Sequence, residues 1–226
     1  MRRRVPTPAE LRLDFQDLSD AYFQQKGLIM ISDENRRLLK DRDIGMFELV
    51  PSQTSPGDRR SLLELQRMVR EKHGTYVYLE IGSFLGGTLT PFCIDEACRA
   101  IYSVDARVVT APNEGSCLTS DYGSHTSLAM RQRLEASTGF DSSKLLCLDS
   151  DMRDVPEDAL PQKSHLVFID GEHTNTAVFS DLLAVEKFLA ADAVIAFHDY
   201  WCVEGGVKRS LEHLRKRGYK SQLAFV

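Results

Sequence analysis

Five short apolar runs recur along the chain from about residue 76, and helical segments separate several of them. The runs are Tyr76–Ile81, Ala100–Val104, Lys144–Leu148, His165–Ile169 and Ala193–Phe197. Runs of about five residues that are apolar on both faces suit strands buried between two layers of helices. Strands that alternate with helices form βαβ units with right-handed crossovers. The pattern therefore predicts an α/β fold of the Rossmann-like, doubly wound type, with a mostly parallel sheet and helices on both faces.

Apolar residues at helical spacing predict three helices around this sheet. One lies between the fourth and fifth runs, one starts at about Ser61 and ends at Gly74, and one near the C-terminus is stopped by Gly218. Their inward-facing residues are predicted to be Val178, Leu182, Val185 and Leu189 in the first helix, Leu62, Leu65, Met68 and Val69 in the second, and Val207, Leu211 and Leu214 in the third. A sixth strand is predicted at Ser221–Val226.

The first 57 residues differ from the rest, because they are polar, charged and interrupted by prolines. They predict an N-terminal helical cap on the substrate side over residues 1–57, followed by the α/β domain over residues 58–226. A chain of 226 residues with 42% hydrophobic content has room for one such domain and a short appendage. The irregular segment Val108–Ser124 is either a lid over a substrate or a surface loop without a function.

Charge and hydropathy narrow the class of partner. The net charge of −5 and the pI near 5.7 give no bulk attraction to nucleic acid. No apolar run approaches the roughly 18 residues of a membrane span. The N-terminal arginines are followed by Val5-Pro-Thr-Pro8 rather than by the apolar stretch of a signal peptide. The sequence therefore predicts a cytoplasmic protein that acts on a small molecule, with no nucleic acid and no membrane as partner, and it leaves a homo-oligomer open.

The first apolar run leads into the turn Glu80-Ile-Gly-Ser-Phe-Leu-Gly-Gly-Thr88. Gly82 can take backbone angles closed to other residues, and Gly86 and Gly87 leave no side chain between the helix start and a docked ligand. The spacing differs from the Gly-x-Gly-x-x-Gly of dinucleotide enzymes, and the turn lacks the Gly-Lys-Ser/Thr of a P-loop. The turn therefore indicates a nucleotide-like ligand that is not bound through a phosphate.

Every predicted strand of the sheet ends at one or more carboxylates. These residues are Glu80, Asp105, Asp149 with Asp151, Asp170, and Asp199. Ligands of open α/β sheets bind at the carboxyl ends of the strands, and a carboxylate after the second strand can accept hydrogen bonds from both hydroxyls of a ribose. An edge this acidic would repel phosphates. A cationic nucleoside fits better, and S-adenosylmethionine has a ribose, an adenine and a sulfonium but no phosphate.

Four motifs in succession resemble those of class I S-adenosylmethionine-dependent methyltransferases. They are Glu80–Thr88, Tyr102-Ser-Val-Asp105, Phe168-Ile-Asp-Gly-Glu-His173 and Phe197-His-Asp-Tyr200. The last two resemble the metal-dependent O-methyltransferases that act on sugars of antibiotics, such as the macrocin O-methyltransferase family. The resemblance covers roughly residues 60 to 215. It implies a seven-stranded sheet of order 3-2-1-4-5-7-6, and the chain offers no residues for the seventh strand.

By position, the resemblance implies a set of cofactor-binding residues. They are Glu80, Gly82, Ser83, Gly86, Asp105, Ser150, Asp151 and Asp170. Within this set, Gly82, Ser83 and Gly86 would border the methionine part of S-adenosylmethionine. Asp105 would hold the ribose, and Ser150 or Asp151 would lie beside the adenine.

The same resemblance implies a divalent metal, usually Mg²⁺, at Asp170, His198 and Asp199. The sugar enzymes carry an acid where this chain has His198. Imidazole is a poor ligand for Mg²⁺ and a good one for Mn²⁺ or Fe²⁺, so those two ions are alternatives. His173 occupies the position of the family's general base beside Asp170, and Glu172 is a competing base.

These residues imply an enzyme that transfers a methyl group from S-adenosylmethionine to a hydroxyl of a sugar or another natural product. Tyr200 and Trp201 either wall the acceptor pocket or are core aromatics. One alternative is a metal-dependent hydroxylase resembling cephalosporin hydroxylase, which would need His173 as a second imidazole ligand. Another is a non-catalytic module that binds S-adenosylmethionine. A dinucleotide-dependent dehydrogenase is disfavoured by the glycine spacing.

Overall fold

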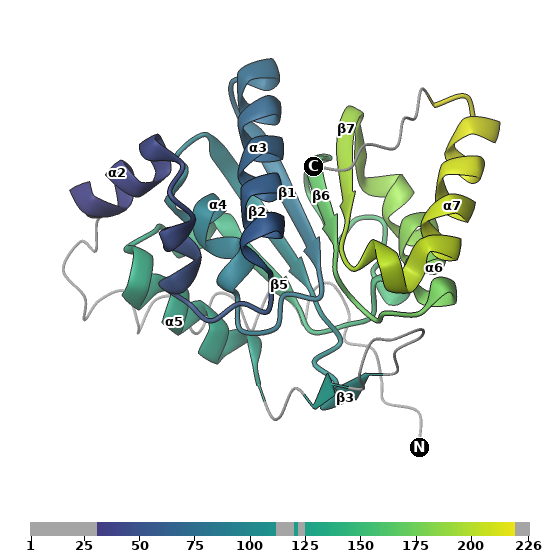
Figure 1. The fold of residues 1–226 in the computed structure, drawn as a ribbon, viewed down its shortest axis with the longest axis horizontal. Helices are drawn as coiled ribbons and strands as arrows, with labels where there is room; N and C mark the ends of the chain where they lie inside the picture. The colour runs from purple at the N-terminus through teal and green to yellow at the C-terminus, as the bar shows by residue number, and fades with distance from the viewer. Residues whose placement is uncertain (1–30, 112–119, 122–124, 220–226) are drawn as a thin grey trace. The chain divides into compact units, whose positions relative to one another are not determined.

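A five-stranded parallel sheet forms the centre of the molecule (Figure 1). The computed structural model describes residues 31–111, 120–121 and 125–219. The strands are β1 (Tyr76–Ile81), β2 (Cys98–Val104), β5 (Leu145–Leu148), β6 (Ser164–Ile169) and β7 (Leu189–Phe197). Their order is β5-β2-β1-β6-β7, and each neighbouring pair is parallel. The predicted fold class is confirmed, and the order matches the first five strands of the expected sheet. The strand predicted at Ser221–Val226 lies outside the described residues.

Helices cover both faces of the sheet, which explains why the strands are mostly apolar. One face carries α3 (Pro56–His73), α4 (Thr90–Ile94) and α5 (Ser127–Thr138), with α2 (Asp33–Asp41) and the 3₁₀ turn η1 (Ile44–Glu48) alongside. The other carries α6 (Asn175–Val185) and the turn η5 (Glu186–Phe188), together with the segment from Met152 to Leu160. Helix α7 (Tyr200–Lys216) packs on α6 through Val178, Val203 and Val207. All six residues of β1 are buried between these layers.

Helix α3 differs from its prediction in its start and in its inward face. It begins at Pro56 instead of Ser61, because Ser55 caps it through a reciprocal pair of hydrogen bonds with Asp58 and a proline is favourable at the first helical position. The predicted end at Gly74 is confirmed. Met68 is 47% exposed, so its inward placement was wrong. The inward position belongs to Gln66, whose amide donates to the Tyr76 hydroxyl at 3.0 Å.

The helix between the fourth and fifth strands ends earlier than predicted. Val178, Leu182 and Val185 are buried on α6 as expected. Leu189 is instead the first residue of β7, because η5 interrupts the helical phase and turns the chain into the strand. Val207 and Leu214 are buried on α7, and Leu211 packs against the cluster that contains Val178, Val203 and Val207. The third predicted helix is therefore confirmed.

The structure describes part of the predicted cap and part of the predicted loop. Met46 and Phe47 of η1 are completely buried in the core that β1 and α3 share. In the segment predicted as a lid or surface loop, β3 (Thr110–Ala111) pairs antiparallel with β4 (Ser120–Asp121). The remaining short turns are η2 (Gly87–Leu89), η3 (Ser142–Lys144) and η4 (Met152–Asp154). No helix within the described ranges has the length and apolar character that crossing a bilayer requires.

Candidate active site

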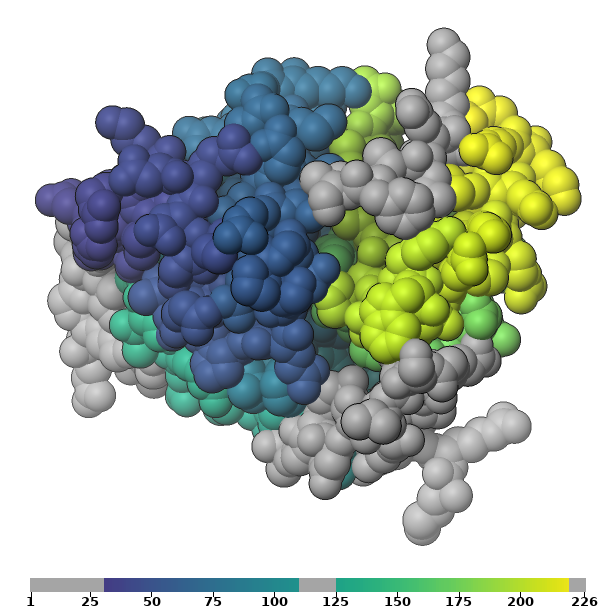
Figure 2. All heavy atoms as spheres, viewed as in Figure 1, coloured from purple at the N-terminus to yellow at the C-terminus, as the bar shows by residue number. Residues whose placement is uncertain are grey.

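A cavity of about 840 Å³ lies at the carboxyl ends of the sheet strands. Its walls include the segments that follow β1, β2, β5, β6 and β7, and also the segment from Pro51 to Thr54. Figure 2 shows α3 and α7 on opposite sides of one face of the molecule. The predicted site residues that line the cavity are Gly82, Ser83, Asp105, Ser150, Asp151, Asp170, His173, His198 and Asp199. Glu80 and Gly86 do not belong to the described lining.

The glycines of the first turn make room for the protein's own chain. Gly82 has φ +84°, and a Cβ there would lie 2.1 Å from the carbonyl oxygen of Asp170. A Cβ on Gly86 would lie 2.8 Å from the side chain of Met130 on α5, and one on Gly87 would lie 2.5 Å from the Pro51 carbonyl oxygen. We expected these glycines to leave space for a ligand. In the structure, each accommodates a neighbouring segment of the fold.

Glu80 is fully buried beneath this turn. The Tyr78 hydroxyl donates to its Oε2 and the Thr88 hydroxyl donates to its Oε1, both at 2.6 Å. Burial raises the pKa of Glu80 to about 7, although these two hydrogen bonds favour the ionised form. Both oxygens are therefore used inside the protein, and Glu80 supports the turn from below.

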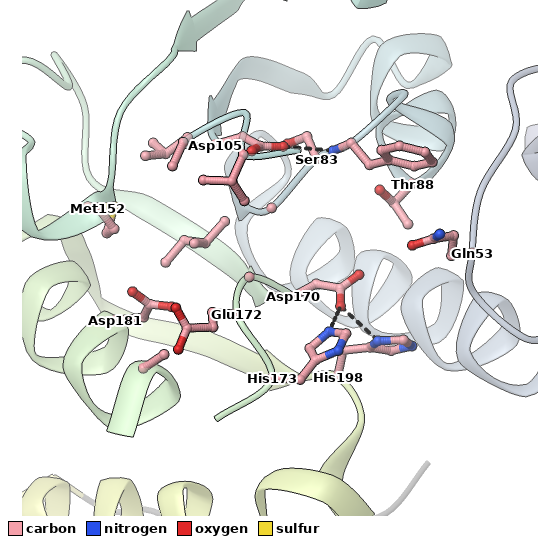
Figure 3. A pocket seen from close by; sticks show the side chains of 18 of the residues that line it. Gln53, Ser83, Thr88, Asp105, Met152, Asp170, Glu172, His173, Asp181 and His198 are labelled. Atoms are coloured by element: carbon pink, nitrogen blue, oxygen red, sulfur yellow. Dashed lines mark hydrogen bonds and ion pairs between the residues drawn. The ribbon is translucent and has the colours of Figure 1, made fainter. Parts of the chain in front are cut away.

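Asp105 follows β2 and faces the cavity beside Ser83 (Figure 3). Its Oδ2 accepts from the Phe84 backbone N–H at 2.9 Å, and its Oδ1 accepts from the Arg107 backbone N–H at 2.8 Å. These bonds hold the carboxylate in one orientation. Oδ2 also lies 3.3 Å from the Arg107 guanidinium, whereas Oδ1 keeps a further lone pair for a ligand. His125, which the sequence did not single out, lies 3.9 Å from Asp105 Oδ2 and also lines the cavity. No motif surrounds His125, so nothing in the sequence marks it.

Ser150, Asp151 and Met152 contribute the wall after β5. Asp151 caps η4, and Arg153 donates to its carboxylate through both the backbone and the guanidinium. The hydrogen bond from Arg153 lowers the pKa of Asp151. The Asp151 carboxylate is thus held by its neighbour, and the buried Met152 supplies an apolar surface beside it.

Asp170, His173 and His198 form a compact group, which we call the acid–imidazole cluster. Asp170 Oδ1 lies 2.8 Å from His198 Nδ1 and 3.4 Å from His173 Nε2. Figure 3 shows both imidazoles directed toward this carboxylate. One ligand atom from each residue lies within 4.8 Å of the others. Carboxylate and imidazole side chains at such separations could serve as ligands of a divalent metal.

Asp199 lies at the edge of the cluster. Its Oδ2 is 3.4 Å from His173 Nδ1 and 3.5 Å from His198 Nδ1. Asp199 has φ +47°, a left-handed conformation that is unfavourable for a residue with a side chain, and it turns β7 directly into α7. Such backbone strain in a cavity wall is typical of functional sites.

The charges of the cluster stabilise one another. Burial alone would lower the pKa of His198, but the carboxylates of Asp170, Asp58 and Asp199 outweigh it and raise this pKa to about 11. For Asp170, burial acts to raise the pKa, and His198 and His173 more than compensate, so the net shift is downward. Without a metal, the ionised Asp170 carboxylate is therefore paired with a protonated His198 imidazole, which would have to release its proton for its nitrogen to bind an ion.

Three further residues, Glu172, Asp181 and Trp201, line the cavity. Asp181 on α6 lies near Glu172 (Figure 3), and burial together with the charge of Asp151 raises its pKa to about 7. Trp201 is 62% exposed and lines the cavity, so it is a wall residue and not a core aromatic. The sequence did not predict Asp181 as a site residue, because it lies among the apolar positions of α6 and belongs to no motif.

This fold and this arrangement of strand ends are those of a class I S-adenosylmethionine-dependent methyltransferase. The family described as "Methyltransferase domain" matches residues 79–200, which is more than half of the chain. The chain belongs to that family, and the predicted resemblance to class I methyltransferases is confirmed. No curated protein matches the sequence.

Two solved structures support the fold. The calicheamicin methyltransferase CalS11 is 14% identical with a TM-score of 0.55, and the match covers 88% of this chain and 92% of that one. The O-methyltransferase NovP is 14% identical with a TM-score of 0.56, and the match covers 73% of this chain and 75% of that one. At this identity the likeness concerns the fold and not the acceptor.

Proposed function

We propose that this protein is an O-methyltransferase that methylates a hydroxyl of a small natural product, such as a sugar, with the help of a divalent metal. The observation that carries the proposal is the acid–imidazole cluster, which shares one cavity with the glycine turn and Asp105. The proteins of similar fold include an O-methyltransferase and a calicheamicin methyltransferase, which supports methyl transfer to a natural product.

The residues after β1, β2 and β5 suit the cofactor. When bound, S-adenosylmethionine supplies the methyl group on a sulfonium, which makes the transfer an in-line displacement. Asp105 is oriented by two backbone N–H groups and can accept from both ribose hydroxyls. Met152 offers an apolar contact for the adenine next to Ser150 and Asp151. Ser83 borders the methionine end, where Ser103 donates to its hydroxyl at 2.8 Å.

The acid–imidazole cluster suits a divalent metal. Two ligand atoms bound to one ion at right angles are about 3 Å apart, close to the separation of Asp170 Oδ1 and His198 Nδ1. Asp170 and His198 would hold the ion, with Asp199 beside them. A metal there would lower the pKa of the acceptor hydroxyl and orient its oxygen. Mg²⁺ is the ion of the related sugar enzymes, while the imidazole favours Mn²⁺ or Fe²⁺.

His173 is the proposed general base. Its Nδ1 faces the Asp199 carboxylate at 3.4 Å, which can hold the ring. Its Nε2 faces Asp170 Oδ1 at 3.4 Å and would accept the proton of a hydroxyl that approaches this carboxylate. Trp201 at the cavity wall offers a flat surface for the acceptor. The residues of this chain would thus align the hydroxyl, remove its proton and keep its oxygen close to the methyl carbon, where alignment supplies much of the rate.

One observation favours a second candidate. Two imidazoles and one carboxylate are the ligand set of non-haem iron oxygenases, and the ligand atoms of His173, His198 and Asp170 converge in this way. If His173 is a ligand, the protein would be a hydroxylase that shares the methyltransferase fold. Oxygen consumption with ferrous iron, compared with methyl transfer from S-adenosylmethionine, separates the two candidates.

The test uses labelled S-adenosylmethionine, a panel of glycosides and phenols, and two variants, one directed at the metal and one at the cofactor. Asp170→Asn should lower methyl transfer by more than about 100-fold and weaken metal binding, while S-adenosylmethionine still binds. Asp105→Asn should weaken S-adenosylmethionine by about tenfold and leave metal binding unchanged. Asp192→Asn is the control, because Asp192 is exposed and pairs with Lys72 away from the cavity. If a chelator and Asp170→Asn both leave transfer unchanged, metal assistance is wrong.

A further inference from the structure

Asp58 lies outside every motif of the sequence, yet it reaches the acid–imidazole cluster. It occupies the third position of α3, where its Oδ2 accepts from the Ser55 backbone N–H at 2.8 Å. The same oxygen lies 3.3 Å from His198 Nε2. His198 lines the cavity, whereas Asp58 is not among the described residues of the lining.

The two nitrogens of His198 face different groups. Nε2 faces only Asp58 among the ion pairs of the described residues, whereas Nδ1 faces Asp170 and Asp199. Nδ1 is buried and makes no hydrogen bond of acceptable direction within the described part of the chain, although Asp170 Oδ1 is only 2.8 Å away. Two atoms that are this close but poorly aligned on each other suit a pair directed at a common third point.

We propose that Asp58 is the positioning residue of the metal site, because it accepts the Nε2–H of His198 and so presents Nδ1 to the ion. This inference rests on the proposed function, which supplies the metal. A histidine ligand commonly donates its other N–H to a carboxylate, which sets the tautomer, fixes the ring and makes the ligand nitrogen more basic. Here that carboxylate comes from the first turn of α3.

The capping box explains how Asp58 keeps its place. The backbone N–H of Ser55 donates to the Asp58 carboxylate and holds this side chain at the helix start. The Ser55 hydroxyl accepts from the backbone N–H of Asp58 at 3.2 Å. The segment just before it, from Pro51 to Thr54, lines the cavity. The start of α3 therefore forms part of the metal site as well as part of the fold.

The experiment measures Co²⁺ binding to the full chain by its visible absorption, which also reports imidazole ligation. Asp58→Ala should weaken Co²⁺ by about 10- to 100-fold. Asp58→Asn should retain much of the affinity, because its amide oxygen can still accept from Nε2–H. Ser55→Ala is the matched control: it removes the hydroxyl that caps the helix and keeps the backbone N–H that holds the Asp58 carboxylate. Ser55→Ala should bind Co²⁺ as the parent does, and S-adenosylmethionine should bind equally well to all four proteins.

Three results would overturn the proposal. Asp58→Ala could bind Co²⁺ as tightly as the parent, which would leave Asp58 as a helix cap only. Ser55→Ala could weaken Co²⁺ as much as Asp58→Ala, which would trace the effect to the helix start. If the parent binds no divalent metal, this inference and the proposed metal assistance fail together, whereas methyl transfer in the presence of a chelator would show that the methyltransferase itself stands.

Discussion

Glu80 on β1 is fully buried, whereas Asp170, which directly follows the neighbouring strand β6, is partly buried, and the surroundings of the two carboxylates differ. Hydroxyls of Tyr78 and Thr88 occupy the oxygens of Glu80, and burial raises its pKa to about 7. Asp170 lies between two imidazoles, and its pKa is lowered. Neutral donors inside the fold mark the first as structural. Imidazole partners at a cavity wall mark the second as a candidate for chemistry.

The same contrast separates the two halves of the cavity. In the half around the glycine turn, polar groups bind one another and the glycines accommodate the chain. In the half around the acid–imidazole cluster, charged groups from β6, β7 and α3 face one another at 2.8 to 3.5 Å. The first half is a rigid support, while the second is arranged for a bound cation. The halves meet where Gly82 contacts the Asp170 backbone.

The largest expected effect breaks this contact. Gly82→Ala places a Cβ 2.1 Å from the Asp170 carbonyl oxygen, in a conformation with φ +84°. We expect it to destabilise the fold by more than about 4 kcal/mol and to weaken both cofactor and metal binding. Urea unfolding measures the loss.

Gly74→Ala is the matched control for this change. Gly74 also has a positive φ, of +73°, but no atom lies within 4 Å of its added Cβ. It should cost less, about 1 to 3 kcal/mol, which is the strain of a side chain at φ +73° and ψ −58°. Equal costs for the two variants would show that the close contact with Asp170 does not matter.

The next effect tests whether Glu80 is structural. A carboxyl whose folded pKa exceeds its unfolded value binds more protons in the folded state, so stability falls as pH rises between the two values. For Glu80 this window runs from 4.5 to about 7. Across it the parent should lose about 3 kcal/mol relative to Glu80→Gln, whose amide does not titrate. The check is the difference in unfolding free energy between the two proteins, measured at several pH values.

A constant difference between the parent and Glu80→Gln would mean that Glu80 does not titrate in this window. In that case its environment would resemble that of Asp170 and the contrast between the two carboxylates would disappear. A loss of methyl transfer in Glu80→Gln, with stability unchanged, would place Glu80 in the chemistry.

The smallest effect concerns the acceptor. Trp201→Ala should raise the KM for the acceptor by about fivefold and leave kcat nearly unchanged, because a stacking contact contributes about 1 kcal/mol to binding. Stability should hardly change, since the side chain is 62% exposed. Leu183→Ala is the control, an exposed apolar residue that is not part of the described lining. A matching KM in both variants would remove Trp201 from the acceptor site.

Much of the site could be predicted because parallel strands bring their carboxyl ends to one edge. Because the apolar runs predict parallel strands, Asp105, Asp170 and Asp199 are expected at the same edge of the sheet, wherever the helices pack. His173 follows Asp170 by three residues and His198 precedes Asp199, so local connection carried both imidazoles to the same place. Asp181, His125 and Asp58 lacked such a connection and were missed.

The sequence by itself determined the strands, their parallel direction and the edge of the sheet where the cavity lies, because the apolar pattern depends on burial between two helix layers. Only the tertiary structure decided what each polar residue does there. Glu80 is buried beneath the turn, and the glycines of the turn pack closely against Asp170, Met130 and Pro51. Asp58 contacts His198, which lies 140 positions later in the sequence. These outcomes depend on distances between segments remote in sequence, and such distances exist only once the chain has packed.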